Sequence, residues 1–565
     1  MSFKNTLIDA STTGDISVTG TSAGNHGIFN NFTSNNVYNL KLVGKNVSLN
    51  GSTSGASKSG IYSYIGSSAG NIITAAQNIT ITGTANGTGT ASGLYYVTTN
   101  WQNFVNSYTA GGSIALSGTN TAAGSTGEAV RLFGVRASTT GSGNITVNAS
   151  TQNAAVNAIN IYSAGMIVGF GYQGGATSLA STSGDVKIQT NQGGVLLNDG
   201  VPNNVTTTTL SGRNISIDNT GGSIDAVTGV ITKGAGYSSS SNSGVKLNDA
   251  RTLTATGNLN LYGVGTSGSG VEISAGAALS AANININGEN TGSVANTAAI
   301  NITSTASTLS STAATTLTSG GVGSGTSLLA AGNIAVGTQL KVTTPAAGTV
   351  SGLISGNGSL LKMGAGQTKL TAYDGTTYGT NTFTGGTTIS QGTLLFGNGN
   401  GAYNKTAGAG TFILGDANTG SSNVALLIDK GKDAWQAALS RAITVSNNGT
   451  GTATIGGAAF ASGSGWTIIN SAISLNRDLI LTDATSDRLG VEGALTGTGN
   501  ITVSGSGSRI TMSTAQTFTG DVTITAGNIL QAGITNLFNS TTNVVANGEL
   551  RMNNTSQVIL SLIHI

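Results

Sequence analysis

Histidine, the side chain most used for proton transfer at neutral pH, occurs in this sequence only at His26 and His564. Residues 20–24 read Gly-Thr-Ser-Ala-Gly and match the G-x-S-x-G pattern of a nucleophile elbow, close to His26. That elbow needs a strand that turns into a helix, and no helix-forming sequence follows Gly24. In a chain so rich in serine and glycine the match is expected by chance. It does not predict a serine hydrolase.

Carboxylates are the other candidates for acid–base chemistry. In an active site, two or more of them must lie close together. The densest charged groups are Asp429, Lys430, Lys432 and Asp433, and Arg477, Asp478, Asp483, Asp487 and Arg488. Both groups alternate in sign, which favours solvated turns. Residues 169–174 (Gly-Phe-Gly-Tyr-Gln-Gly) fit a dinucleotide-type glycine pattern but lead into no helix. With no cysteine and no histidine cluster to hold zinc, we predict no catalytic, cofactor-binding or metal-binding residues and no enzyme activity.

One cluster of aromatic residues has a spacing that could serve recognition. It consists of Tyr95, Tyr96, Trp101, Phe104 and Tyr108. Aromatic rings on a strand face or loop can stack against sugar rings, so these five residues are the candidate ligand-binding residues. The alternative is burial against the flank of the fold, because aromatic clusters usually belong to a core.

The composition limits the elements that could position such residues. The chain has 565 residues, 87 of them glycine, with only 22 basic and 20 acidic residues and a net charge of +2. Abundant Thr, Ser, Asn and Gly disfavour helices, whereas Thr, Val and Ile favour strands, so we expect an all-β fold. The sequence has no block of Lys or Arg residues, so it does not predict nucleic-acid binding. No apolar run is long enough for a transmembrane helix.

A short segment recurs along the first part of the chain: a turn pair followed by an apolar, a polar and an apolar residue. Its first aliphatic residues are Ile16, Val47, Ile79, Ile114, Ile145, Val186, Ile215, Leu259, Ile284 and Ile334, separated by 31, 32, 35, 31, 41, 29, 44, 25 and 50 residues. A second apolar segment, such as residues 60–64 or 93–97, lies between copies. Such spacing is too long for hairpins and predicts the coils of a parallel β-solenoid, with at least two strands per coil.

From about residue 351 the pattern changes. Residues 356–366 (Gly-Asn-Gly-Ser-Leu-Leu-Lys-Met-Gly-Ala-Gly) and 381–397 (Asn-Thr-Phe-Thr-Gly-Gly-Thr-Thr-Ile-Ser-Gln-Gly-Thr-Leu-Leu-Phe-Gly) resemble the autotransporter-associated β-strand repeat. Residues 497–503 and 516–533 resemble a second copy, in which Asp521 and Asn528 replace the usual Gly and Thr. This resemblance covers residues 351–535. Residues 1–340 resemble, more loosely, the repeats of filamentous-haemagglutinin-type adhesins.

We therefore expect three regions: an irregular solenoid over residues 1–345, an autotransporter-repeat solenoid over 346–559, and a non-native tail over 560–565. The tail, Leu-Ser-Leu-Ile-His-Ile, departs abruptly from the repeat pattern and equals the translation of a transposon-end adapter sequence. Residues 432–441 have a helix-like composition and form either a cap or a further strand.

The expected fold is an elongated, right-handed parallel β-helix, the hand following from strand twist and from the resemblance. The resemblance implies a passenger region at a bacterial surface or secreted from it, with an outer-membrane barrel or another anchor outside this chain. The expected function is an adhesin or projecting stalk whose partner is a carbohydrate or a cell-surface ligand. The alternatives are a β-helical polysaccharide-degrading enzyme and a structural or ice-binding solenoid.

Overall fold

The computed structural model describes residues 1–3, 6–32, 40–65, 70–98, 105–163, 176–198, 208–235, 242–248, 251–274, 276–294, 297–321, 323, 325–372, 379–397, 407–429, 436–458, 466–483, 488–553, 555–557 and 561–564. These residues form strands, turns and irregular segments and include no helix. None of them therefore forms a helix that could cross a membrane. The chain divides into two compact units. Unit 1 comprises Met1–Thr312 and Thr318–Thr326, and unit 2 comprises Ala313–Leu317 and Ser327–Ile565.

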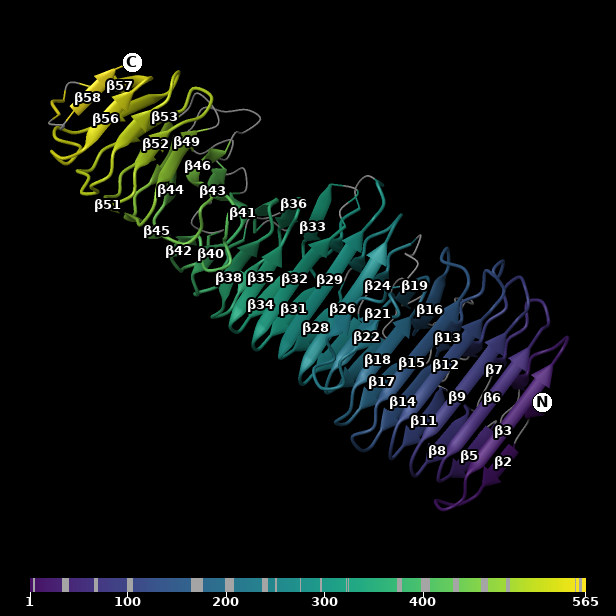
Figure 1. Cartoon of the computed structure of the whole chain (residues 1–565). Coiled ribbons are helices and arrows are strands. Elements are labelled where there is room, and N and C mark those ends of the chain that lie inside the picture. The colour runs from purple at the N-terminus through teal and green to yellow at the C-terminus, as the bar shows by residue number, and fades with distance from the viewer. Residues whose placement is uncertain are drawn as a thin grey trace, which may run out of the picture. The chain divides into compact units, whose positions relative to one another are not determined.

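Unit 1 is a parallel β-solenoid whose coils each place one strand in each of three sheets, in the chain order sheet II, sheet III, sheet I (Figure 1). Sheet I contains β1 (Ser2–Phe3), β4 (Ile28–Phe32), β7 (Ile61–Ile65), β10 (Leu94–Thr98), β13 (Val130–Phe133), β16 (Asn157–Tyr162), β19 (Gly194–Asn198), β24 (Val245–Leu247), β27 (Val271–Ile273) and β30 (Ile300–Ile302). Sheet II contains β2 (Thr6–Asp9), β5 (Leu40–Gly44), β8 (Ile72–Ala75), β11 (Asn106–Ala110), β14 (Val135–Thr139), β17 (Ser178–Ser181), β20 (Thr208–Gly212), β25 (Arg251–Ala255), β28 (Ala278–Ala281) and β31 (Thr308–Ser311). Sheet III contains β3 (Ile16–Ser22), β6 (Val47–Thr53), β9 (Ile79–Ala85), β12 (Ile114–Asn120), β15 (Ile145–Thr151), β18 (Val186–Thr190), β21 (Ile215–Asp218), β26 (Asn258–Gly265) and β29 (Asn283–Asn290).

A hairpin lies outside this regular order, whereas strand β32 (Ala314–Gly320) is a further strand of sheet III. The small antiparallel hairpin, β22 (Ser223–Ile224) and β23 (Ile231–Thr232), is inserted between β21 and β24. Strand β32 lies where the chain divides between the units.

Unit 2 is also built from stacked parallel strands. Sheet I there contains β33 (Thr326–Ala330), β36 (Ala347–Val350), β39 (Gln367–Leu370), β41 (Gly392–Phe396), β43 (Val424–Asp429), β46 (Ala453–Ala458), β49 (Leu479–Asp483), β52 (Ile501–Val503), β54 (Val522–Ile524), β56 (Asn543–Ala546) and β58 (Ser561–His564). Sheet III contains β35 (Gln339–Thr343), β38 (Ser359–Met363), β40 (Thr387–Ile389), β42 (Phe412–Leu414), β45 (Ile443–Val445), β48 (Ile473–Leu475) and β51 (Leu495–Gly497). Sheet II contains only β34 (Asn333–Val336) and β37 (Ile354–Ser355) among the described residues. A separate sheet IV contains β44 (Gln436–Leu439), β47 (Trp466–Ile469), β50 (Arg488–Val491), β53 (Arg509–Met512), β55 (Ile529–Ala532) and β57 (Glu549–Arg551).

The repeated segment forms the strands of sheet III in unit 1. Ile16 pairs with Val47, Val47 with Ile79 and Ile79 with Ile114, so residues 31, 32 and 35 positions apart become neighbours. The aliphatic residues point inward and are buried, while the Ser and Thr between them face outward. Period-two alternation thus places one apolar ladder inside each sheet, and the ladders of the three sheets form the core.

The sequence-based prediction of a parallel β-solenoid is confirmed, with one correction. Coils of unit 1 contain three strands, which agrees with the expectation of at least two, and the strands of sheet II are short and carry fewer aliphatic residues. The segment at Ile334 does not continue the sheet III ladder. Its strand β34 pairs with β37 in sheet II, and the sheet III ladder of unit 2 instead begins at Leu340, which pairs with Leu360.

Coil length changes between the units. Paired residues in sheet III are 25 to 44 positions apart in unit 1, as in Leu259 with Ile284 and Ile215 with Leu259. In unit 2 the separation ranges from 20, for Leu340 with Leu360, to 31, for Phe412 with Ile443, so the shortest coils lie in unit 2 and the two ranges overlap. Contacts divide the chain between residues 312 and 327, whereas the repeat pattern changes near residue 346.

Two segments whose structure the sequence left open form strands. Residues 436–439, within the helix-like stretch, form β44 and pair in parallel with β47. A further strand is therefore the correct alternative for that part, and residues 432–435 lie outside the described residues. The C-terminal residues 561–564 form β58, in parallel register with β56.

Candidate functional site

The five aromatic residues singled out in the sequence do not act as one group. Tyr96 and Tyr108 are 2% and 1% exposed and lie in the core, where their rings meet edge to face with centroids 6.1 Å apart. Burial raises the pKa of Tyr96 to about 12. Both rings are thus packed in the core, as the alternative of burial predicts for these two residues. Trp101 and Phe104 lie outside the described residues.

Tyr95 is the member of the group that faces outward. Successive side chains of a strand point to opposite faces, so Tyr95 in β10 lies on the outer surface while its neighbours Leu94 and Tyr96 are buried. The register of sheet I places Tyr95 beside Tyr62 of β7 and Arg131 of β13, and Tyr62 beside Phe29 of β4. We call Phe29, Tyr62, Tyr95 and Arg131 the aromatic column.

The members of the aromatic column stack on one another. The Tyr62 and Tyr95 rings are 5.2 Å apart and inclined by only 7°, and the Phe29 and Tyr62 rings are 5.6 Å apart. The Arg131 guanidinium lies 4.9 Å from the Tyr95 centroid and 5.2 Å from that of Tyr162. Coil stacking and offset ring stacking therefore reinforce each other, and the column is held rigidly before any ligand arrives.

Arg131 is fixed by further contacts. Its Nε donates a hydrogen bond of 2.6 Å to the Tyr162 hydroxyl, and its Nη1 lies 3.9 Å from a carboxylate oxygen of Glu128. Asn160 donates to the other Glu128 oxygen at 3.2 Å. The side chains of Arg131 and Glu128 remain 30% and 22% exposed. A paired, oriented guanidinium and carboxylate are thus presented to solvent at the end of the column.

His26 extends the aromatic surface sideways. Its ring stacks on Tyr62, with centroids 4.4 Å apart, and on Phe29 at 5.4 Å. Its Nδ1 accepts the backbone N–H of Ser59 at 2.9 Å. Burial and the nearby Lys58 ammonium lower the pKa of His26 to about 4, so the imidazole is neutral at physiological pH. Ser22, the serine of the elbow-like match, accepts the Asn25 N–H within β3 and its turn, and no helix follows.

A surface groove of about 630 Å³ runs along these side chains. It is lined by the rings of His26, Phe29, Tyr62 and Tyr95, by the charged groups of Glu128 and Arg131, and by a rim of hydroxyl groups from Ser57, Ser59, Thr90 and Thr126. The rim residues belong to the corner at which the chain passes from sheet III to sheet I. A pocket of this size, lined by rings and hydroxyl groups, suits a small polyhydroxylated molecule.

The sequence contained a signal for this column that the search for clustered aromatics missed. Each member follows a small residue and an aliphatic residue, as in Gly27-Ile28-Phe29, Gly60-Ile61-Tyr62, Gly93-Leu94-Tyr95 and Ala129-Val130-Arg131. The members are about one coil apart, so a search at coil spacing, and not within one loop, would have found them.

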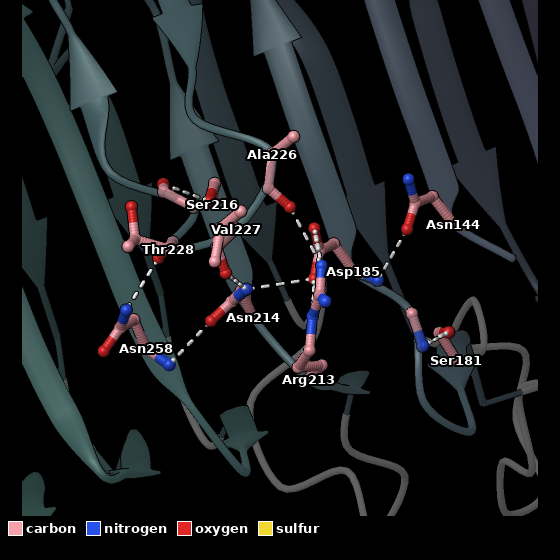
Figure 2. A network of polar contacts seen from close by, with 12 residues as sticks. Asn144, Ser181, Asp185, Arg213, Asn214, Ser216, Ala226, Val227, Thr228 and Asn258 are labelled. Carbon is pink, nitrogen blue, oxygen red and sulfur yellow. Dashed lines mark hydrogen bonds and ion pairs between the residues drawn. The ribbon is translucent and has the colours of Figure 1, made fainter. Parts of the chain in front are cut away.

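A second polar network joins residues at the start of neighbouring sheet III strands (Figure 2). The turn residue before each strand bonds to the next coil: Asn144 Oδ1 accepts from Asp185 N–H at 2.8 Å, Asn214 Nδ2 donates to Asp185 at 3.1 Å, and Asn214 Oδ1 accepts from Asn258 N–H at 2.9 Å. Arg213 makes a two-pronged bond to Asp185, at 2.9 and 3.0 Å. Backbone carbonyls of the inserted hairpin accept from Arg213, Asn214 and Asn258. The network joins coils and anchors the hairpin, which is a structural role.

Of the described residues in the charged groups of unit 2, Arg477 and Asp478 lie in the turn between β48 and β49. Asp483 and Arg488 instead belong to strands β49 and β50, and Asp483 is buried, so the expected solvated turn is wrong for these two residues. Asp478 accepts the N–H of Asn500 at 2.9 Å, Arg477 donates to the carbonyls of Gly449 and Gly451, and Arg488 lies 4.4 Å from the Trp466 centroid. Lys430, Lys432, Asp433, Asp487 and residues 169–174 lie outside the described residues, as does the Asp429 side chain. No group of three or more His, Cys, Asp or Glu within the described part of the chain could hold a metal ion.

Lys362, the lysine of the repeat-like segment 356–366, is fully buried. Its Nζ donates to the carbonyls of Met363, Gly364 and Gln391, at 2.8, 2.7 and 3.1 Å. Burial lowers its pKa to about 7. Because Gln391 belongs to the next coil, this lysine ties two corners together through all three of its donors.

No family model, curated protein or solved structure matches the chain. The chemistry of the groove at the aromatic column therefore has to be judged from its own residues.

Proposed function

We propose that the chain is part of a surface-exposed or secreted bacterial adhesin, and that its solenoid binds glycans at the aromatic column. The observation that carries the proposal is the groove lined by stacked rings and a rim of hydroxyl groups beside an oriented Arg131 and Glu128. Sugars present both apolar C–H surfaces and hydroxyl groups, and tyrosine offers an apolar ring with a polar tip. The surface location rests on the resemblance of residues 351–535 to autotransporter-associated repeats.

The test is retention of the purified full chain on a panel of immobilised polysaccharides. The variants Tyr95→Ser and Arg131→Ala are expected to lower retention at least about tenfold, because they remove a ring and the main charged donor of the groove. The matched control is Trp466→Ala, which removes an exposed aromatic residue that also stacks with an arginine but lies in unit 2, outside the groove.

Two results would contradict the proposal. Retention that is equal in the wild-type chain and in both groove variants would remove the aromatic column from the function. Release of new reducing ends from a bound polysaccharide would instead favour the alternative of a polysaccharide-degrading enzyme. Each variant is compared with the wild type by circular dichroism and by its urea midpoint, so that loss of folding is distinguished from loss of binding.

A further inference from the structure

A second hollow lies on the same sheet, farther along the coils. It has a volume of about 440 Å³ and is lined by Leu196, Asn198, Ser243, Lys246, Asn248 and Ser267, among others. The register of sheet I continues the aromatic column to it: Arg131 lies beside Asn160, Asn160 beside Leu196, and Leu196 beside Lys246. The two hollows therefore lie on one row of outward-facing positions.

Both hollows also share the same rim. Glu128 and Thr126 border the first and Ser243 and Ser267 the second, and all four residues lie just before sheet I strands, at the corner that follows sheet III. A ligand lying along the row would thus contact the aromatic rings of the first hollow and the Asn side chains of the second hollow on the same face of sheet I.

The charges along this row are paired. Arg131 faces Glu128 at 3.9 Å, and Lys246 Nζ lies 2.8 Å from Glu272, which also accepts a hydrogen bond of 2.6 Å from Ser243. His26 is neutral at physiological pH because burial lowers its pKa. Paired charges give little net attraction to an anionic or cationic polymer, so the row favours an uncharged ligand.

The repeat distance of the row gives the ligand's form. Adjacent strands are about 4.8 Å apart, so the six steps from Phe29 to Lys246 span about 29 Å. One strand step is close to the length of one sugar residue in an extended β-1,4-linked chain. We propose, on the basis of the proposed function, that the ligand is a neutral, linear, β-1,4-linked polysaccharide that lies across the strands along the coil stack and occupies both hollows.

The experiment measures calorimetric binding of β-1,4-linked glucose and N-acetylglucosamine oligomers, three and six residues long, to the full chain. The six-residue oligomer of at least one series is expected to bind about tenfold more tightly than the three-residue one, because only the longer oligomer covers the full row from Phe29 to Lys246 and so fills both hollows. In the second hollow, Asn248 donates to Asn198 at 2.9 Å. The variant Asn248→Ala is expected to weaken six-residue binding about tenfold, because Asn248 lines the second hollow.

The matched control is Asn285→Ala, because Asn285 donates to Asn260 at the same distance of 2.9 Å, but on sheet III. It is expected to change neither affinity. The inference is overturned if three and six residues bind equally, if Asn248→Ala has no effect, if neither series binds, or if a six-residue polyuronate binds more tightly. In those cases the proposed function still stands when Tyr95→Ser and Arg131→Ala reduce polysaccharide retention, and it fails when they do not.

Discussion

Tyr95 and Tyr96 are neighbours in the sequence and lie on opposite faces of their strand. The Tyr96 ring packs against Tyr108 in the core, whereas the Tyr95 ring joins a row of rings that faces solvent. The difference follows from the pleat of β10, which turns successive side chains to opposite faces. At the scale of single residues, strand phase therefore decides which aromatic side chain is available for recognition.

His26 provides a pH test of the groove. Its pKa is about 4 in the folded chain, against 6.5 for an unperturbed histidine. Between these values the unfolded state binds a proton that the folded state does not, so stability falls as the pH is lowered from 6.5 to 4 and rises in the other direction. We expect the urea midpoint of unit 1 to follow this course.

The variant His26→Phe keeps a ring for stacking on Tyr62 and removes the titrating group. Its urea midpoint should depend less on pH than that of the wild type over the same interval, although both proteins share the titration of their carboxylates. If the urea midpoints of the wild type and of His26→Phe change equally with pH, the pKa of His26 is not lowered by folding.

Asp185 tests the polar network of sheet III. Its side chain is 1% exposed and accepts from both Arg213 and Asn214, whereas Asp15 occupies the same position of the repeat and is exposed, with Asn46 as its partner. Asp185→Ala should lower the free energy of unfolding by about 2 kcal/mol, because a buried carboxylate with several donors is lost. Asp15→Ala should lower it by only a few tenths. Equal urea-midpoint shifts would contradict a special role for the network.

At the scale of elements, the turn between two sheets of a coil limits the size of the side chains in the strand beside it. Strands of sheet III run directly against the start of the following sheet I strand. At Gly83 an added Cβ would overlap the carbonyl oxygen of Gly93. Glycine at such a position permits the close approach of two backbones that closes the coil.

Gly83→Ala should therefore destabilise unit 1 by about 1–3 kcal/mol, the usual cost of forcing an extra methyl group into a packed site. The control is Gly124→Ala, since a Cβ there would meet nothing within 4 Å. Urea titration of both variants measures the difference. A Gly83→Ala variant as stable as the control would show that the corner can relax.

At the scale of the whole molecule, charge is sparse and balanced. Basic and acidic residues number 22 and 20, and Arg131 and Lys246 beside the two hollows are paired with Glu128 and Glu272. Long-range electrostatic steering should thus be weak, in contrast to proteins that bind charged polymers.

Glycan retention by the full chain should accordingly change less than about twofold between about 50 mM and about 500 mM salt. The measurement is a retention assay repeated across this range, with an anionic polysaccharide as the comparison. A steep loss of retention with salt would indicate that Arg131 or Lys246 acts as an unpaired cation, and would contradict the charge pairing seen in the structure.

The sequence alone determined the class of fold and most of the sheet III core. Alternating aliphatic residues after a turn pair at Ile16, Val47 and Ile79 predicted inward ladders, because period two and burial of one face follow from the strand backbone itself. The same reasoning missed the strands of sheet II and misplaced Ile334, whose segment has the same pattern but lies in another sheet.

Only the tertiary structure decided which outward-facing residues meet. Phe29, Tyr62, Tyr95 and Arg131 are 33 to 36 positions apart, while coil lengths elsewhere in unit 1 range from 25 to 44. Residues so far apart become neighbours only when each coil closes in register, and corner insertions of variable length hide that register from the sequence. The buried ladder therefore follows from local periodicity, whereas the groove follows from the register between coils.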